Sequence, residues 1–254
     1  MSKGKVYLVG AGPGDPELIT LKALNVLKRA DVVVYDWLIS DEIIELFPPK
    51  AERIFVGKTS GRHTMPQSEI NELILRKANE GRIVVRLKGG DPFLFGRGGE
   101  EAEVLTKAGA RYEVIPGVST ALAVPAYAGI PLTHREYASS VAIATGHEMA
   151  EKGERCVNWR KLAGSADTLV VLMGVKRMGW IVQELILGGI QKDTPAAIVE
   201  RGTTSRQRVI TAPLAAIADE AAKHQIGPPA VIIVGNVVKL REQLSWFRGD
   251  KHAP

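Results

Sequence analysis

The first half of the chain alternates short apolar runs with segments of helical spacing. Four apolar runs are predicted to be strands, at Lys5–Val9, Val32–Tyr35, Arg82–Leu87 and Glu113–Ile115. Helical spacing is found at residues 15–27, Ser68–Asn79, Glu100–Ala108 and Thr120–Ala128, and the first of these segments opens on an Asp-Pro pair that suits a helix N-terminus. Strands that alternate with helices predict an α/β domain whose sheet is mainly parallel.

The second half repeats this alternation after a connecting segment, Gly129–Arg135. Strands are predicted at Ser140–Thr145, Thr168–Met173, Ala196–Glu200, Arg208–Thr211 and Ala230–Val234, and helices at Met178–Leu187 and Pro213–Lys223. The strand at Arg208 begins too soon after Glu200 for a crossover helix, so this sheet is predicted to be mixed. We expect an N-terminal α/β domain over residues 1–130 and a C-terminal α/β domain over residues 131–254.

Composition places the chain among ordinary globular proteins, with 254 residues of which 45% are apolar. Its apolar runs fall far below the roughly 20 residues that cross a bilayer, and its N-terminus lacks the apolar stretch of a secretory signal. The single cysteine, Cys156, permits no internal disulfide, and the five histidines have no metal-ligand spacing. These features predict a cytoplasmic protein without a metal site or a membrane partner.

The first predicted strand leads into a glycine-rich loop, Gly10-Ala-Gly-Pro-Gly14. A dinucleotide-binding loop needs a third glycine where this chain has Asp15, and Pro13 removes a backbone N–H donor. A carboxylate at a helix N-terminus also repels phosphate. A plain tight turn and a loop beside a ligand without phosphate both remain open for this segment.

The stretch from Gly89 to Gly99 is the strongest functional signal, because five of its eleven residues are glycine. Glycine at this density lets backbone approach a ligand closely, and Asp91 and Arg97 add one charge of each sign to the loop. Phe93 and its apolar neighbours are unusual for a merely flexible surface loop. We interpret the stretch as a ligand-binding loop.

Two further charged residues follow predicted strands. Asp36 comes directly after Tyr35, where open parallel sheets bind their ligands. Gly57-Lys58-Thr59 is similar to the end of a phosphate-binding loop, but Glu52 replaces the glycine that such a loop requires. Lys58 is therefore either a solvated loop charge or a site residue.

Six segments together resemble the uroporphyrinogen-III C-methyltransferases of the tetrapyrrole methylase superfamily. They are residues 9–20, 35–36, 56–58, 86–101, 116–119 and 129–135. The similarity extends from Val6 to about Val238. It implies a two-domain α/β fold in which each domain is a mainly parallel or mixed sheet flanked by helices, with S-adenosyl-L-methionine bound in the cleft between the domains.

The same resemblance implies an activity. Methyl groups would pass from S-adenosyl-L-methionine to carbons 2 and 7 of uroporphyrinogen III, giving precorrin-2 for sirohaem or cobalamin biosynthesis and leaving S-adenosyl-L-homocysteine. It further implies a small-molecule tetrapyrrole substrate, a homodimer, and no part for nucleic acid or a metal. A sulfonium cofactor without phosphate also suits a glycine-rich loop that carries an aspartate.

The resemblance assigns roles to individual residues. It implies that Asp36 is the proton acceptor and Lys58 the proton donor. Cofactor contacts would fall on Pro13, Gly89, Gly90, Asp91, Leu94, Ser119, Thr120, Met173, Gly202 and Ala230. The family commonly has Thr-Ala in place of Ser119-Thr120. Among the cations available for the substrate's carboxylates we select Arg62, Arg97 and Arg135 as candidates; Lys88, Arg177 and Arg201 are also available.

Three other functions remain open from sequence. A later corrin methyltransferase or a diphthamide-pathway enzyme would share the fold and differ in product. The isoelectric point of about 9.3 is compatible with an RNA methyltransferase, although the chain has no concentrated run of lysine and arginine. A catalytically silent binding protein would bind the cofactor without turning it over.

Overall fold

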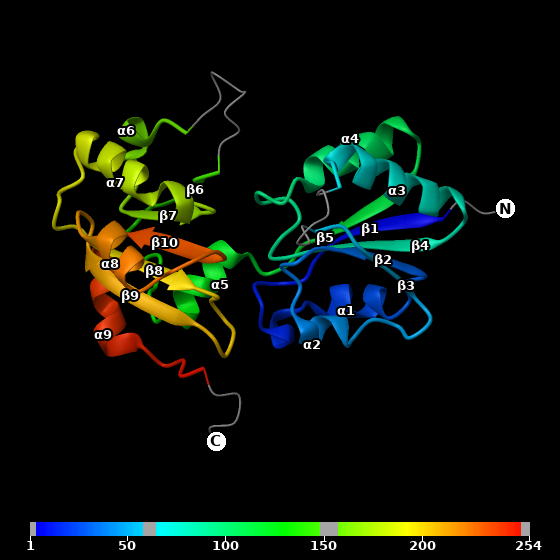
Figure 1. Ribbon diagram of the computed structural model, residues 1–254, viewed down its shortest axis with the longest axis horizontal. Coiled ribbons are helices and arrows are strands. Elements are labelled where there is room, and N and C mark those ends of the chain that lie inside the picture. Colours follow the sequence, from blue (N-terminus) through cyan, green and yellow to red (C-terminus); the bar gives the residue numbers. More distant parts are fainter. Residues whose placement is uncertain (1–3, 58–64, 148–156, 250–254) are drawn as a thin grey trace. The chain divides into compact units, whose positions relative to one another are not determined.

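In the computed structural model, which describes residues 4–57, 65–147 and 157–249, the chain divides into two units, Met1–Thr120 and Ala121–Pro254. Each unit is built around one five-stranded sheet with helices packed against it (Figure 1). In the part of the chain that the structure describes, no helix is long and apolar enough to span a membrane.

The first unit has a fully parallel sheet with the strand order β3-β2-β4-β1-β5. Its strands are β1 (Lys5–Gly10), β2 (Val32–Tyr35), β3 (Glu52–Phe55), β4 (Ile83–Lys88) and β5 (Arg111–Ile115). The central strands are buried on both faces, because alternate valines of β2 and β4 enter different hydrophobic clusters. This explains why these strands appear in the sequence as continuous apolar runs.

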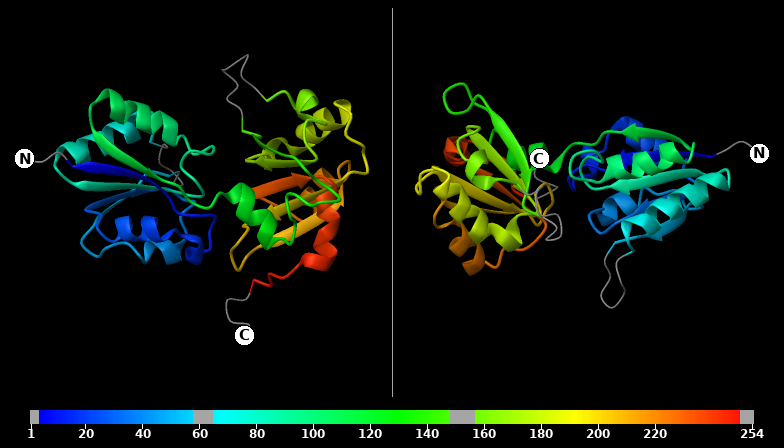
Figure 2. Two further views of the ribbon diagram at one scale, coloured as in Figure 1. Left: turned by 180° about the vertical axis from the view of Figure 1, so that it is seen from behind. Right: turned by 90° about the horizontal axis from the view of Figure 1, so that it is seen from above.

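Helices cover both faces of this sheet. They are α1 (Leu21–Leu27), α2 (Asp41–Ile44), α3 (Gln67–Asn79) and α4 (Gly98–Lys107), preceded by the 3₁₀ helix η1 (Pro16–Leu18). Apolar residues of α1 and α2 pack against one face, and those of α3 and α4 against the other. Figures 1 and 2 show the two helical layers on opposite sides of the strands.

The helix predicted over residues 15–27 is two separate elements. The Asp15 side chain accepts a hydrogen bond from Glu17 N and caps only η1. The chain then extends, and Thr20 begins α1 by accepting a hydrogen bond from Ala23 N at 3.1 Å. This second N-cap, two residues after the end of η1, starts a new helix, and the regular leucine spacing does not reveal the break.

The second unit has a mixed sheet, as predicted, with the order β6-β7-β10-β8-β9. Its strands are β6 (Val141–Thr145), β7 (Thr168–Leu172), β8 (Pro195–Glu200), β9 (Arg208–Pro213) and β10 (Ala230–Val234). The pair β6–β7 is parallel, whereas β10 is antiparallel to both β7 and β8, and β8 is antiparallel to β9. The short link from β8 to β9 therefore forms a hairpin-like pair instead of a crossover.

Helices also pack against the sheet of the second unit (Figure 1). The elements are α5 (Thr120–Tyr127), α6 (Trp159–Leu162), α7 (Met178–Leu187), α8 (Ile217–Lys223) and α9 (Arg241–Leu244), with the 3₁₀ helices η2 (Val175–Arg177) and η3 (Asn236–Leu240). Residues of α6, α7 and α8 share one hydrophobic cluster with alternate residues of β7, β8 and β10.

The two units divide at Thr120, earlier than the boundary predicted at residue 130. The intervening helix α5 is bound to the second unit. Gln207 Nε2 donates to Tyr127 O at 3.1 Å, and Trp246 Nε1 donates to Ala126 O at 3.0 Å. The connecting segment after α5 therefore lies inside the second unit and does not separate the units.

Candidate active site

The order of the strands in the first unit creates a natural site at one edge of its sheet. From β1 the chain crosses β4 to reach β2, whereas from β4 it crosses β1 to reach β5. Parallel sheets bind ligands beyond the carboxyl ends of strands at such a reversal. The predicted residues Pro13, Asp36, Gly89 and Ser119 all follow carboxyl ends of these strands.

Backbone contacts draw the glycine loops after β1 and β4 together. Gly12 N donates to Gly90 O at 3.2 Å, and Gly90 N donates to Gly12 O at 2.6 Å. Thr120 lies beside Gly90, because a Cβ on this glycine would be 3.1 Å from Thr120 Oγ1. Pro13 directly follows Gly12, so the predicted contacts of the first unit converge on one edge.

Asp91 holds the glycine-rich loop in its conformation. Its Oδ1 accepts hydrogen bonds from Phe93 N at 2.8 Å and Leu94 N at 3.1 Å. Its Oδ2 accepts from Gly117 N at 3.1 Å and so fastens the loop after β4 to the loop after β5. Both oxygens therefore have backbone partners, and the negative charge stays at the edge where a cationic cofactor is predicted.

Asp36 lies on the turn after β2, next to the same loop. Its Oδ1 accepts a hydrogen bond from Leu38 N at 3.1 Å, and its Oδ2 accepts one from Arg86 Nη2 at 3.4 Å. Leu38 packs against Gly89, where an added Cβ would be 2.8 Å from Leu38 Cβ. The turn thus places Asp36 beside the glycine loop, with its side chain 21% exposed.

Two predicted residues lie outside the described residues. They are Lys58, the predicted proton donor, and Arg62, a predicted substrate contact.

The three cofactor residues predicted in the second unit also meet at one sheet edge. Because β10 is antiparallel to β7 and β8, its amino end lies beside their carboxyl ends. Leu172 pairs with Val231, and Glu200 pairs with Ala230. Met173 directly follows β7 and Gly202 is the second residue after β8, so both lie near the end of the sheet where Ala230 begins β10.

A buried carboxylate fixes the chain around this second edge. Glu200, which is 5% exposed, accepts hydrogen bonds from Gly227 N at 2.8 Å and from Arg208 Nε at 2.6 Å. Arg208 also donates to the carbonyl oxygens of His224 and Gln225. These contacts hold the segment that leads into Ala230.

The two described candidates for substrate binding differ in their surroundings. Arg97 forms a two-pronged ion pair with Glu100, at 3.0 and 2.7 Å, and this pairing raises the pKa of Arg97. Arg135 lies exposed on the tight turn closed by the bridge between His134 and Ala138. Arg97 belongs to the first unit and Arg135 to the second.

Sequence reasoning missed a buried charge cluster beside Asp36. Arg86 and Lys88 of β4 are 4% and 5% exposed, and both donate to Glu101 of α4, at 3.1 and 2.9 Å. Burial and the neighbouring Arg86 lower the pKa of Lys88. Because its side chain is buried, Lys88 does not face solvent as a contact for substrate. The sequence does contain a signal for this cluster, because Arg86 and Lys88 stand two residues apart in an otherwise apolar strand. Charges buried in such a strand need buried partners of opposite charge.

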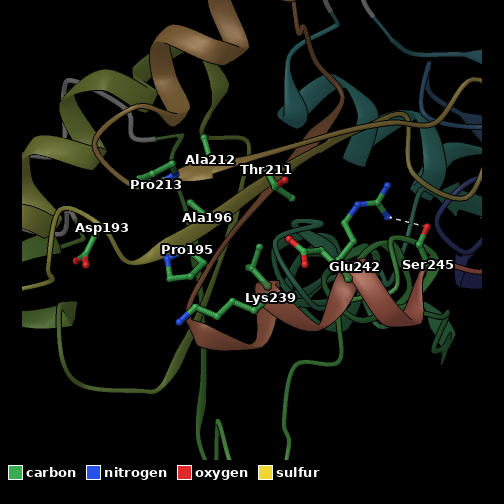
Figure 3. Close-up of a pocket in the computed structure, with 11 residues that line it drawn as sticks. Asp193, Pro195, Ala196, Thr211, Ala212, Pro213, Lys239, Glu242 and Ser245 are labelled. Atoms are coloured by element: carbon green, nitrogen blue, oxygen red, sulfur yellow. Dashed lines mark hydrogen bonds between the residues drawn. The ribbon is translucent and has the colours of Figure 1, made fainter.

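A cavity of about 400 Å³ lies elsewhere in the second unit, between the β8–β9 pair and the segment η3–α9 (Figure 3). Its lining residues are Asp193, Pro195, Ala196, Thr211, Ala212, Pro213, Val238, Lys239, Arg241, Glu242 and Ser245. None of the predicted cofactor, substrate or catalytic residues is among them. We therefore assign this cavity no role in the site at the strand ends.

Comparison with known proteins identifies the class. Residues 5–218 match the sequence model of the family Tetrapyrrole (Corrin/Porphyrin) Methylases. The chain belongs to this family, which confirms the resemblance drawn from the sequence.

Individual relatives are more specific. The chain is 54% identical over 245 residues to an S-adenosyl-L-methionine-dependent uroporphyrinogen III methyltransferase of Methanosarcina barkeri, covering 96% of both chains. It is 51% identical to a siroheme synthase of Thiobacillus denitrificans, covering 97% of this chain and 51% of that protein. The chain thus spans about half of that relative and nearly all of the first.

A solved structure shares the fold. The uroporphyrin-III C-methyl transferase of Thermus thermophilus, complexed with S-adenyl homocysteine, has a TM-score of 0.80 and 45% sequence identity to this chain. The match covers 93% of this chain and 100% of that one. The two-domain tetrapyrrole methylase fold predicted from sequence is therefore confirmed.

Proposed function

We propose that this protein transfers methyl groups from S-adenosyl-L-methionine to carbons 2 and 7 of uroporphyrinogen III, giving precorrin-2. The observation that carries the proposal is the gathering of the predicted residues at one strand edge in each unit. The 54% identity to the Methanosarcina barkeri enzyme supports the same substrate. Precorrin-2 would feed sirohaem or cobalamin biosynthesis.

The residues at these edges fit S-adenosyl-L-methionine. The cofactor supplies a methyl group bound to a sulfonium cation, and it carries no phosphate. Asp91 gives the first edge a carboxylate that is fixed by three backbone N–H groups. The contacts we propose are those of Pro13, Gly89, Gly90, Asp91, Leu94, Ser119 and Thr120 in the first unit, and of Met173, Gly202 and Ala230 in the second.

Asp36 is the proton acceptor in this proposal. A pyrrole carbon that gains a methyl group must lose a proton from the ring system as the double bonds rearrange. The hydrogen bond from Leu38 N and the ion pair with Arg86 hold the Asp36 carboxylate at the end of β2. Lys58 supplies a proton or holds a substrate carboxylate. The rate of methyl transfer then depends mainly on the positioning of substrate and cofactor and on the exclusion of water from the sulfonium.

The substrate's carboxylates need cationic partners. Arg135 is exposed and available for one of them, while Arg97 would have to share its guanidinium with Glu100. Arg62 is the third proposed partner. We further propose that the protein is a cytoplasmic homodimer that acts on this small molecule and binds neither nucleic acid nor membrane.

An anaerobic assay tests the function. Purified protein is incubated with labelled S-adenosyl-L-methionine and uroporphyrinogen III, and the product is examined by mass and absorbance. We expect two added methyl groups and a dipyrrocorphin-type spectrum. An unmethylated tetrapyrrole would contradict the proposal, and transfer to a later corrin or to RNA would replace it.

The same assay tests the two proton-transfer roles. Asp36→Asn and Lys58→Met should each lower turnover by about 10²–10⁴-fold, the usual contribution of general acid–base catalysis. Binding of S-adenosyl-L-homocysteine should persist in both variants. Near-normal turnover in both would show that these residues are structural.

A further inference from the structure

The buried cluster behind Asp36 is held together by a single carboxylate oxygen. Glu101 Oε1 accepts hydrogen bonds from Arg86 Nε at 3.1 Å, Lys88 Nζ at 2.9 Å and Gln67 Nε2 at 3.0 Å. Glu101 is 1% exposed, and its Oε2 is buried without a hydrogen-bond partner among the described residues. Burying a carboxylate costs free energy unless cations and hydrogen bonds compensate its charge, and here all three donors contact one oxygen.

Arg86 links this carboxylate to the proposed proton acceptor. Its Nη1 donates to Leu87 O at 3.1 Å and to Val34 O at 3.4 Å. The remaining nitrogens are directed to two carboxylates, Nε to Glu101 and Nη2 to Asp36. The planar guanidinium is thus fixed on three sides and presents its fourth contact to Asp36.

The charges of the cluster balance. Arg86 and Lys88 carry two positive charges, and Asp36 and Glu101 carry two negative charges. In the low dielectric of a buried site, removing one of these charges leaves an uncompensated ion next to Asp36. The balance therefore depends on Glu101, which contacts both cations.

We propose that Glu101 is a positioning residue for methyl transfer: it clamps Arg86, and Arg86 in turn holds the Asp36 carboxylate for proton acceptance. This inference rests on the proposed function for its effect on turnover. It assigns Glu101 no contact with substrate or cofactor. The cofactor loop is fastened separately, through the Gly12–Gly90 pair and the bonds of Asp91.

The substitution Glu101→Gln removes the negative charge of the side chain and keeps its size and shape. The amide oxygen can keep the three hydrogen bonds, and the amide nitrogen takes the place of the partnerless Oε2. We expect kcat to fall at least about tenfold, while the affinity for S-adenosyl-L-homocysteine stays within about twofold. Glu103→Gln, on the exposed side of the same helix, is the matched control and should keep wild-type kcat.

Two double variants separate positioning from general structural damage. Adding Lys88→Met to Glu101→Gln restores the charge balance, so most of the lost kcat should return. In an Asp36→Asn background, Glu101→Gln should cause no further loss, because Glu101 acts through Asp36. Additive losses in that background, or full activity of Glu101→Gln alone, would overturn the proposal.

A measurement without turnover tests the clamp itself. The Nε–H nuclear magnetic resonance signal of Arg86, assigned by its loss in Arg86→Lys, should exchange with solvent at least about tenfold more slowly than that of exposed Arg206. Fast exchange of the Arg86 signal would overturn the clamp. If the wild-type protein fails to methylate uroporphyrinogen III, the proposed function fails, and the comparison of this exchange rate between the wild type and Glu101→Gln still decides whether Glu101 holds Arg86: faster exchange in the variant is expected, and an unchanged rate would overturn the clamp.

Discussion

At the scale of single residues, glycines decide how closely the loops of the first unit approach. A Cβ on Gly117 would lie 2.2 Å from Gly90 O and 2.7 Å from Gly10 Cα. The corresponding position on Gly99, in the first turn of α4, has no atom within 4 Å. The two glycines therefore serve different purposes, one for close backbone contact and one without a steric need.

This difference predicts opposite effects of the same substitution. Gly117→Ala should lower the free energy of unfolding by ~1–3 kcal/mol, because the methyl group forces the loops apart. Gly99→Ala should raise it by ~0.5–1 kcal/mol, since alanine costs less entropy in a helix. Urea denaturation of both variants measures the changes. A Gly117→Ala protein as stable as the wild type would show that the loops separate freely.

At the scale of elements, Arg208 orders the loop of the second unit that leads into β10. Arg208 joins β9 to Glu200 on β8 and to the carbonyls before β10. Arg201 N donates to Pro229 O at 2.9 Å and adds a backbone link to the same segment. The position of Ala230 thus depends on contacts between elements distant in sequence.

We expect Arg208→Met to weaken binding of S-adenosyl-L-homocysteine by about tenfold, which corresponds to the loss of a charge-assisted hydrogen bond. The physical reason is that Glu200 loses a partner and the segment leading to Ala230 loosens. Titration calorimetry measures the affinity. Arg206→Met, two residues away and exposed, is the control and should bind like the wild type. Equal affinities of Arg208→Met and the wild type for S-adenosyl-L-homocysteine would mean that the contacts of Arg208 do not order the proposed cofactor residues of the second unit.

Elements were predictable where the core imposes a pattern. The buried strands β2, β4 and β10 follow apolar runs, so the sequence locates them closely. The strand β3 alternates partly buried with exposed residues and includes Glu52 and Arg53, and α2 is only four residues long. Neither has enough apolar residues for a clear signal, which is why the strand before Lys58 is predicted without bounds and α2 is not predicted.

The site was predictable in part for a similar reason. The glycine loop after β4 is contiguous in sequence, so its density of glycine was visible. The pairing of Lys88 with Glu101 is a contact between a strand and a helix, and sequence spacing alone does not reveal such a pair. Lys88 was therefore interpreted as a possible substrate contact although it is buried.

At the scale of the whole molecule, ion pairs and hydrogen bonds to carboxylates link stability to pH in both units. In the first unit, Lys22 and Lys5 lower the pKa of Glu113 from 4.5 to about 2, and Lys77 and Arg82 lower that of Glu52. In the second unit, backbone and hydroxyl donors of residues 139–140 lower the pKa of Asp167. In each unit, therefore, the ionised form of these carboxyl groups favours the folded state.

Stability should therefore fall with acid. A carboxyl with a depressed folded pKa stabilises the protein above its unfolded pKa, so the contribution of Glu113 is lost as the pH falls from 4.5 to about 2. The ion pairs of Glu113 with Lys5 and with Lys22 are both partly exposed to water, and each is worth only ~0.2–1 kcal/mol. Glu113→Gln should lower the melting temperature at pH 7 and leave it nearly unchanged near pH 2, where the wild-type carboxyl is about half protonated and most of its contribution to stability is lost. Melting curves across this range measure the effect, with Glu103→Gln as the control because its lysine partner is 4.0 Å away and both side chains are exposed. A deficit in Glu113→Gln that persisted at the acid end would show that the side chain stabilises the fold by packing and not by its charge.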